Sequence, residues 1–219
     1  MNGNNLAFRS DPKSFLESHF VMCYTHLTQQ KNDINRMDGN TLPVTQSFGQ
    51  TVEFDLVSNP MGYVDLKLLG THGSFKKSSI TRGLGYGDPV VGNYIPYLGQ
   101  IDGVEAPVGG KFGKINLSRV PTNYVFTLSF SGCNFVITKK NGETFVYHEP
   151  TDTMWTAALA NRYPGEQVVK SVGPAYDDDH LNGFGCLVRA SPSRWIVYVQ
   201  TCAMGQTGVT DLLEDIIEI

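Results

Sequence analysis

A chain of 219 residues with 41% hydrophobic and 17% charged content is long enough to bury a full core and has the composition of a globular domain. Its formal net charge of −4 disfavours a nucleic-acid partner, because neutralising phosphates requires clustered Lys and Arg. No segment has the length and hydrophobicity of a membrane-spanning helix, so we expect no membrane anchor. The four cysteines show no CxxC spacing, which indicates neither a zinc site nor a redox pair. We expect one domain over residues 1–219.

The N-terminal segment predicts a helix over about residues 11–30. Asp11 is a good N-cap, and Pro12 suits the first helical position. Apolar side chains then recur at helical spacing, at Leu16, Phe20, Cys23 and Leu27. The residues before this helix lack a basic segment followed by an apolar one, so no Sec-type signal peptide is visible.

Beyond residue 50 the pattern changes to short strands rich in β-branched and aromatic residues. We predict strands at 51–56 and 63–69, separated by a turn at 59–62. Residues 83–113 are rich in Gly and Pro and predict long irregular loops, of the kind that often form binding lids.

The second half of the chain predicts further strands and one short helix. The strands are expected at 124–130, 134–138, 143–148, 187–190 and 195–201, and the helix at 153–162. The acidic, partly apolar tail at 211–219 is expected to dock on the sheet.

Residues 124–148 contain the pattern most informative about function. Side chains alternate along a strand, so Thr127 points away from the face that carries the large residues of 124–130. Ser131 and Gly132 allow the backbone to bend, and Cys133 then begins the next strand.

A hairpin turn determines which way Cys133 faces. Asn141-Gly142 is the strongest short signal for a two-residue type I′ turn, and opposite charges on the first pair beyond it support this register. The register places Phe135 opposite His148. Cys133 then becomes the diagonal neighbour of His148 on the same face, at a backbone separation of roughly 7–8 Å.

A thiol and an imidazole on one face form the pair that amide chemistry needs. The imidazole lowers the thiol pKa and accepts its proton, so Cys133 is the candidate nucleophile and His148 the candidate base. Thr127 would orient the imidazole, and the Ser131-Gly132 turn would present N–H groups to an oxyanion. From the residues alone, a structural Cys packed beside a buried His remains the alternative.

Two acidic features, at Glu149 and at Asp177–His180, are interpreted as non-catalytic. The run from Asp177 to His180 cannot turn consecutive side chains to one ion, so we predict an acidic loop and no metal site. Glu149 adjoins His148 but points to the opposite face of its strand, and no role is assigned to it.

Residues 127–133, Thr-Leu-Ser-Phe-Ser-Gly-Cys, followed by His148, resemble the active-site region of the toxin glutamine deamidases. This family includes the Burkholderia lethal factor and the catalytic domain of the cytotoxic necrotizing factors. Both carry Leu-Ser-Gly-Cys with a downstream His, and the lethal factor also has a Thr at the spacing of Thr127. Here Phe130 replaces the usual Leu, and the interval from Cys to His is longer than in the lethal factor.

The resemblance implies an α+β fold with a mixed β-sandwich core flanked by helices. It also implies that the Cys133 thiolate attacks a glutamine carboxamide and that His148 protonates the departing ammonia. Water then hydrolyses the thioester to leave glutamate, with Thr127 as third member of the triad and no metal or cofactor.

By the same resemblance, the substrate would be a host protein. Similarity to the lethal factor suggests a translation-initiation helicase, and similarity to the necrotizing factors suggests a Rho-family GTPase. The chain would be a monomeric virulence effector, secreted from a bacterium by a separate delivery system and active in the host cytoplasm.

Three alternative hypotheses stay open. A transglutaminase or thiol protease would use the same Cys133–His148 pair with a different acceptor or bond. A bacterial chemoreceptor deamidase also uses a Thr, a Cys and a His, although the larger size and loop-rich insertion here weigh against it. A β-rich binding module would hold Cys133 as an inert thiol.

Overall fold

The computed structural model describes residues 2–22, 51–71, 88–95, 114–127, 133–150, 163, 165–173, 182–202, 208–209 and 211–219. The helices are α1 (Gly3–Ser10), α2 (Pro12–Ser18) and the short 3₁₀ helix η2 (Leu117–Arg119). The first six strands are β1 (Val21–Met22), β2 (Thr51–Ser58), β3 (Val64–Thr71), β4 (Val90–Ile95), β5 (Lys114–Asn116) and β6 (Tyr124–Thr127). The remaining strands are β7 (Cys133–Lys140), β8 (Glu143–Pro150), β9 (Gln167–Val172), β10 (Asn182–Ser191), β11 (Arg194–Cys202) and β12 (Asp211–Glu218).

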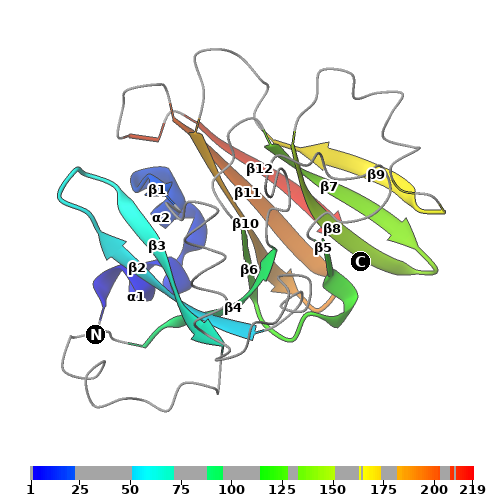
Figure 1. The fold of residues 1–219 in the computed structure, drawn as a ribbon, viewed down its shortest axis with the longest axis horizontal. Coiled ribbons are helices and arrows are strands. Elements are labelled where there is room, and N and C mark those ends of the chain that lie inside the picture. Colours follow the sequence, from blue (N-terminus) through cyan, green and yellow to red (C-terminus); the bar gives the residue numbers. More distant parts are fainter. Residues whose placement is uncertain are drawn as a thin grey trace, which may run out of the picture.

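The described strands form two sheets, and together with the helices they make an α+β fold dominated by β structure. The larger sheet has eight strands in the order β1-β3-β2-β4-β6-β10-β11-β12, and the smaller has four in the order β5-β8-β7-β9. The larger sheet is mixed, because β1 runs parallel to β3 and β4 runs parallel to β6. Figure 1 shows the smaller sheet beside the β10–β12 part of the larger one, away from the two helices.

Each face of the larger sheet is covered by a different layer. Toward the helices, Phe8 and Phe15 pack on Phe54 and Phe126 in one buried cluster. On the opposite face, side chains of β10, β11 and β12 form a second cluster with those of the smaller sheet, including Trp195. The two sheets therefore pack face to face, and the layer between them is a closely packed hydrophobic core.

The predicted helix over residues 11–30 is wrong in length, because α2 ends at Ser18 and β1 begins at Val21. Its start is confirmed: the Asp11 side chain accepts a hydrogen bond from the backbone of Ser14, and Pro12 is the first helical residue. The reason for the early end lies far away in the sequence.

The side chain of Gln200 in β11 holds the chain where α2 ends. It donates hydrogen bonds to the carbonyl oxygens of Leu16 and His19 and accepts one from the backbone N–H of Val21. These bonds satisfy backbone groups that a longer helix would have paired internally. Residues 23–30 lie outside the described part of the chain.

The helix α1 was not predicted from the sequence, and a buried amide fixes it to the larger sheet. Asn5 donates to the carboxylate of Asp55 at 2.6 Å and accepts from the backbone N–H of Leu56 at 2.8 Å. Asn5 and Asp55 are both buried, and the hydrogen bond between them offsets the cost of burying the amide of one and the carboxylate of the other.

The prediction of irregular loops over 83–113 is wrong for residues 90–95, which form β4 inside the larger sheet. β4 pairs with β2 on one side and with β6 on the other. Gly92 permits this fit, since a Cβ there would lie 3.0 Å from the carbonyl oxygen of Tyr124. β9 was also not predicted, whereas the tail at 211–219 docks as expected, as the edge strand β12. The helix predicted at 153–162 falls outside the described residues.

Lys170 links the two sheets at one edge of the sandwich. Lys170 of β9 bonds to the carboxylate of Asp215 at 2.7 Å and to the carbonyl oxygen of Ile216, both in β12. Among the described strands, β9 is one edge of the smaller sheet and β12 is one edge of the larger, so this contact links the sheets along one side. Within the described residues, no helix is long and apolar enough to cross a membrane.

Candidate active site

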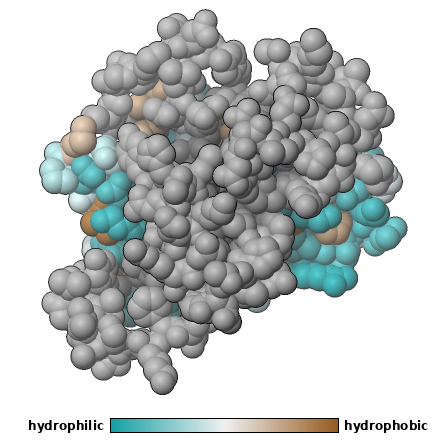
Figure 2. Space-filling model, viewed as in Figure 1, coloured by the Kyte–Doolittle hydropathy of each residue, from teal (hydrophilic) through white to brown (hydrophobic). Residues whose placement is uncertain are grey.

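The hairpin of β7 and β8 has the predicted turn and register. Asn141 and Gly142 both have positive φ, 53° and 78°, as a type I′ turn requires. Phe135 lies opposite His148, and Cys133 lies opposite Pro150, so Cys133 is the diagonal neighbour of His148. The turn is exposed, and Figure 2 shows hydrophilic side chains gathered at that end of the smaller sheet. The other end of the hairpin, which carries the candidate residues, is buried.

Cys133 and His148 both face the layer between the two sheets. Cys133 belongs to the inter-sheet cluster, together with Phe135, Ile137 and Val146 of the same hairpin. Only 6% of Cys133 and 1% of His148 is exposed. The thiol and the imidazole therefore share a nearly dry environment, in which electrostatic interactions are strong.

Thr127 reaches His148 from the other sheet. In β6 the alternation is as predicted: Phe126 packs toward the helices, whereas Thr127 points into the inter-sheet layer. The Thr127 hydroxyl is fully buried and lies 2.5 Å from Nδ1 of His148. It also donates a hydrogen bond of 2.8 Å to the carbonyl oxygen of Ile95 in β4.

These two contacts determine which nitrogen of His148 carries the proton. A hydroxyl has one hydrogen, and that of Thr127 is directed to the Ile95 carbonyl oxygen. Toward His148 the hydroxyl oxygen must therefore accept, so Nδ1 is the protonated nitrogen of the neutral ring. The lone pair is then on Nε2, the nitrogen through which a general base would act.

Burial also determines the charge of His148. Removal from water disfavours the imidazolium and lowers the pKa of His148 to about 3. At neutral pH the ring is uncharged and able to accept a proton. A resting thiolate–imidazolium pair is disfavoured by the same burial, so proton transfer from Cys133 would accompany its attack on a substrate.

The other described cysteines lie elsewhere. Cys186 is in the helix-side cluster, and Cys202 packs with Phe20 and Met22. Burial raises the pKa of both thiols, which makes them poorer nucleophiles. Both are buried core residues of strands, Cys186 in β10 and Cys202 in β11.

The structure adds two features that sequence analysis missed. One is the Ile95 carbonyl, which no side-chain motif can reveal and which lies in an unpredicted strand. The other is Gly173, just after β9. A Cβ at Gly173 would lie 1.8 Å from Oδ1 of Asn134 and 2.7 Å from the carbonyl oxygen of Cys133, so the chain after β9 lies close beside the candidate nucleophile.

Some residues singled out in the sequence lie outside the described part of the chain, and one, Glu149, lies on the opposite face of β8. Ser131 and Gly132 are not among the described residues, so their oxyanion role stays a prediction. Asp177–His180 lie outside as well, and the described residues contain no group of three or more His, Cys, Asp or Glu side chains that could hold a metal ion. Glu149 is buried and pairs with Asn134 on the face opposite His148, as expected from the alternation.

No protein-family model matches the chain, and a search of curated proteins gives no match.

Proposed function

We propose that this protein is a cysteine-dependent deamidase that converts a glutamine of another protein to glutamate. The observation that carries the proposal is the hydrogen bond between Thr127 and His148, with Cys133 diagonally placed on the same inter-sheet face. A hydroxyl that holds an imidazole in one tautomer next to a thiol is the arrangement of a catalytic triad. The likeness of residues 127–133 to the toxin deamidases supports glutamine as the substrate and a deamidase-like sandwich as the fold.

The proposed reaction needs no group beyond this chain, the substrate and water. Nε2 of His148 takes the thiol proton while Sγ of Cys133 attacks the carboxamide carbon. The same proton passes to the amide nitrogen, the C–N bond breaks, and ammonia leaves. Water then attacks the thioester as Nε2 accepts its proton, the C–S bond breaks, and the thiol and a glutamate carboxyl are formed.

The burial of the site favours a side-chain amide over a main-chain amide. Cys133 and His148 are almost fully enclosed between two sheets. A single extended side chain needs only a narrow approach to the thiol, whereas a thiol protease must seat a length of substrate backbone across its nucleophile. This difference supports deamidation over peptide-bond cleavage.

The biological setting is proposed from the sequence motif alone. We propose a secreted bacterial effector that acts in the host cytoplasm, on a translation-initiation helicase or a Rho-family GTPase. These two candidates are the first substrates to test.

Mass spectrometry of candidate proteins after incubation with the chain tests the reaction. Deamidation adds about one dalton at one glutamine, and we expect this gain with wild type and not with Cys133→Ser. Lys67→Gln, a change at an exposed residue of β3, should behave as wild type. If no candidate protein gains mass and a broad set of glutamine peptides releases no ammonia, the proposal is wrong.

The role of Thr127 is tested by a matched pair of variants. Thr127→Val keeps the shape but removes the hydroxyl, so His148 can adopt the wrong tautomer, and we expect kcat to fall by about a hundredfold with little change in KM. Thr127→Ser keeps the hydroxyl and should retain most of the activity. Nitrogen chemical shifts of the His148 ring report the tautomer directly. Full activity in Thr127→Val would show that the hydroxyl is not needed for orientation.

Two further assays separate the alternatives. A primary amine added to the reaction would be incorporated into the glutamine by a transglutaminase, and cleaved peptide would identify a protease. A binding module would modify no glutamine and would release no ammonia from any glutamine peptide.

A further inference from the structure

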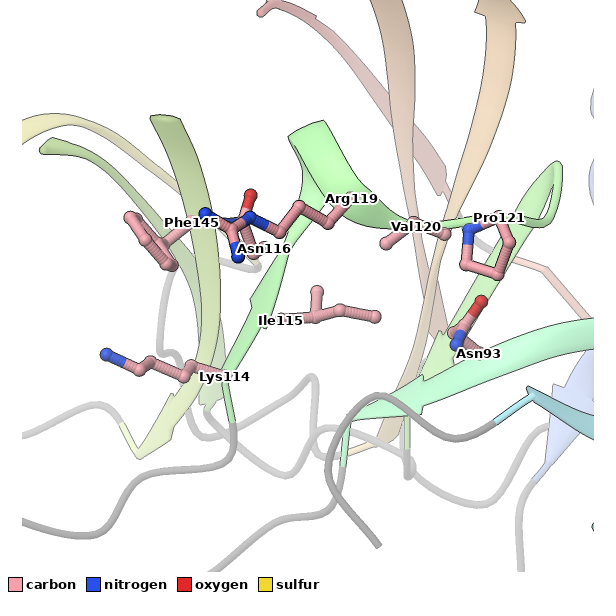
Figure 3. A pocket seen from close by; sticks show the side chains of 8 residues that line it. All are labelled: Asn93, Lys114, Ile115, Asn116, Arg119, Val120, Pro121 and Phe145. Atoms are coloured by element: carbon pink, nitrogen blue, oxygen red, sulfur yellow. The ribbon is translucent and has the colours of Figure 1, made fainter. Parts of the chain in front are cut away.

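A pocket of about 330 Å³ lies along one edge of the smaller sheet, between β5, η2 and β4. Figure 3 shows Ile115 directed toward Asn93, while Lys114 extends to the other side with Phe145. Side chains from both faces of β5 therefore line the pocket, and it follows the edge of this strand. It lies on the β5 side of the sandwich, whereas Lys170 fastens the β9 side.

The pocket is close to the candidate active site. In β4, Asn93 pairs with Val125, and Ile95, the acceptor for Thr127, pairs with Thr127 itself. In the smaller sheet, Ile115 pairs with Val146, two residues before His148. Asn93 and Ile115, at the inner end of the pocket, are thus one side-chain repeat from the level of Thr127 and His148, or roughly 7 Å along the strands. Arg119, which bonds to Glu143, lies farther along the hairpin toward its turn.

The polar lining of the pocket is positive, although the whole chain carries a net charge of −4. Lys114 and Arg119 supply two cations, and none of the eight lining residues is acidic. Asn116 adds an amide beside them, and Phe145 adds apolar surface. This combination suits a carboxylate on a short aliphatic stem, which is an Asp or Glu side chain.

The ion pairs that these cations make in the structure are exchangeable. Arg119 bonds to Glu143 at 2.6 Å, but the Arg119 side chain is 75% exposed. Lys114 lies 3.8 Å from Glu166, near the limit for an ion pair; the Lys114 side chain is 49% exposed, whereas that of Glu166 is 7% exposed. Both cations are thus open to solvent, where an ion pair contributes little, so an incoming carboxylate can share them with their present partners.

The form of the ligand follows from the position of β5. Within the described residues β5 pairs with β8 alone, so it is an edge strand. An edge strand directs alternate N–H and C=O groups outward and can pair with an extended segment of another chain. Because β5 is only three residues long, side-chain contacts in the pocket must supply much of the recognition.

We propose that this pocket is a substrate-recognition subsite that binds an Asp or Glu side chain near the reacting glutamine, in an extended segment of the target protein. The inference rests on the proposed deamidase function and adds a preference of its active site for glutamines that lie near an acidic residue. It predicts that glutamines with an acidic neighbour are modified in preference to those with a basic one.

The test uses a set of synthetic peptides that contain one glutamine and carry either Glu or Lys at each flanking position in turn. Binding is measured by fluorescence anisotropy with Cys133→Ser, and ammonia release is measured with the wild-type cysteine. We expect the best Glu peptide to bind about tenfold more tightly than its Lys counterpart, with a preference that declines as salt is raised.

Two double variants with the same change in charge locate the preference. Lys114→Gln with Arg119→Gln should bring the affinity for the Glu peptide to that for the Lys peptide. Lys67→Gln with Arg194→Gln removes two exposed cations that do not line the pocket and should leave the preference intact. Circular dichroism confirms that each variant is folded.

The outcomes separate this inference from the proposed function. Ammonia release from Glu and Lys peptides alike would overturn the subsite and leave the deamidase. Charge-dependent binding that needs Lys114 and Arg119, with no ammonia released, would uphold the pocket as an acidic-peptide site and overturn the reaction. Equal loss of the preference in both double variants would also overturn the subsite, because net charge alone would then explain it.

Discussion

At the scale of single residues, His148 is held by two independent effects. Burial between the sheets keeps the ring neutral, and the hydroxyl of Thr127 keeps its proton on Nδ1. A base that is neutral and correctly oriented before substrate arrives needs no reorganisation when the reaction begins. The cost of this arrangement is expected to appear in the stability of the protein at acidic pH.

The pH dependence of stability tests the burial of His148. The ordinary pKa of His is 6.5, and burial lowers it to about 3 in the folded protein. Between these values the unfolded chain binds a proton that the folded chain does not, so the free energy of unfolding falls as the pH drops below 6.5. The slope from this one group is about 1.4 kcal/mol per pH unit, and it ends near the folded pKa.

Urea denaturation at pH 7, 6 and 5 measures this slope. The carboxyl groups also titrate, so the contribution of His148 is the difference between wild type and His148→Gln, which lacks the proton-binding site. We expect the variant to lose less stability than wild type on acidification. Parallel curves for the two proteins would show that His148 can be protonated in the folded state.

At the scale of elements, the hairpin was predictable because its information is local. Asn141 and Gly142 set the turn, the turn sets the register, and the register places Cys133 and His148 on one face. The face of Thr127 was equally predictable, from the alternation of side chains in β6. What the sequence does not contain locally is the pairing of distant segments.

The elements that were predicted wrongly depend on distant partners. The helix that starts at Asp11 ends early because Gln200 binds the chain at Leu16, His19 and Val21. β4 forms in a Gly- and Pro-rich region because β2 and β6 offer hydrogen bonds on both sides. The contact of Thr127 with His148 joins two sheets. The motif predicted that these two residues interact, but not the packing of the sheets that brings them together.

Gly173 is a sensitive position, because it follows β9, the strand that pairs with β7, and lies close to the backbone of Cys133. Gly173→Ala would place a methyl group 2.7 Å from the Cys133 carbonyl oxygen and closer still to the Asn134 side chain. Backbone must move to relieve the first contact, so we expect a loss of about 1–3 kcal/mol in unfolding free energy and a shift of Cys133. Gly208→Ala, with no atoms within 4 Å of the new methyl group, is the matched control.

Chemical denaturation and the rate of Cys133 alkylation measure the two effects of Gly173→Ala. Adding Asn134→Ala should relieve only part of the strain, because the contact with the Cys133 carbonyl persists. A Gly173→Ala protein with the stability and alkylation rate of Gly208→Ala would contradict the close packing described at this position.

At the scale of the whole molecule, the larger sheet needs cover on both faces, and the N-terminal helices supply one of them. Phe8 of α1 is 1% exposed and contacts the rings of Phe15, Tyr124 and Phe126 at centroid distances of 5.3–5.7 Å. Phe126 is the neighbour of Thr127 in β6, so this cover lies directly behind the candidate site. The helices are therefore part of the same cooperative core as the sheets.

Replacing Phe8 should destabilise the entire fold. Phe8→Ala removes a fully buried ring and leaves a cavity, with an expected cost of about 3–5 kcal/mol. Leu6→Ala is the control on the same helix, because Leu6 is 47% exposed and its loss should cost about 0.5 kcal/mol or less. Equilibrium unfolding in urea measures both. If the two variants lose similar stability, the helices do not seal this face of the sheet.

The hydrogen bond from Thr127 to His148 joins one sheet to the other, and this has a consequence for partly folded states. The candidate triad is assembled only when the sandwich is closed, since neither sheet alone contains all three residues. A partly folded chain that has formed only one of its sheets therefore lacks the candidate triad. If the proposed deamidase must unfold to reach its place of action, we expect it to be inactive in transit and to become active when the two sheets meet.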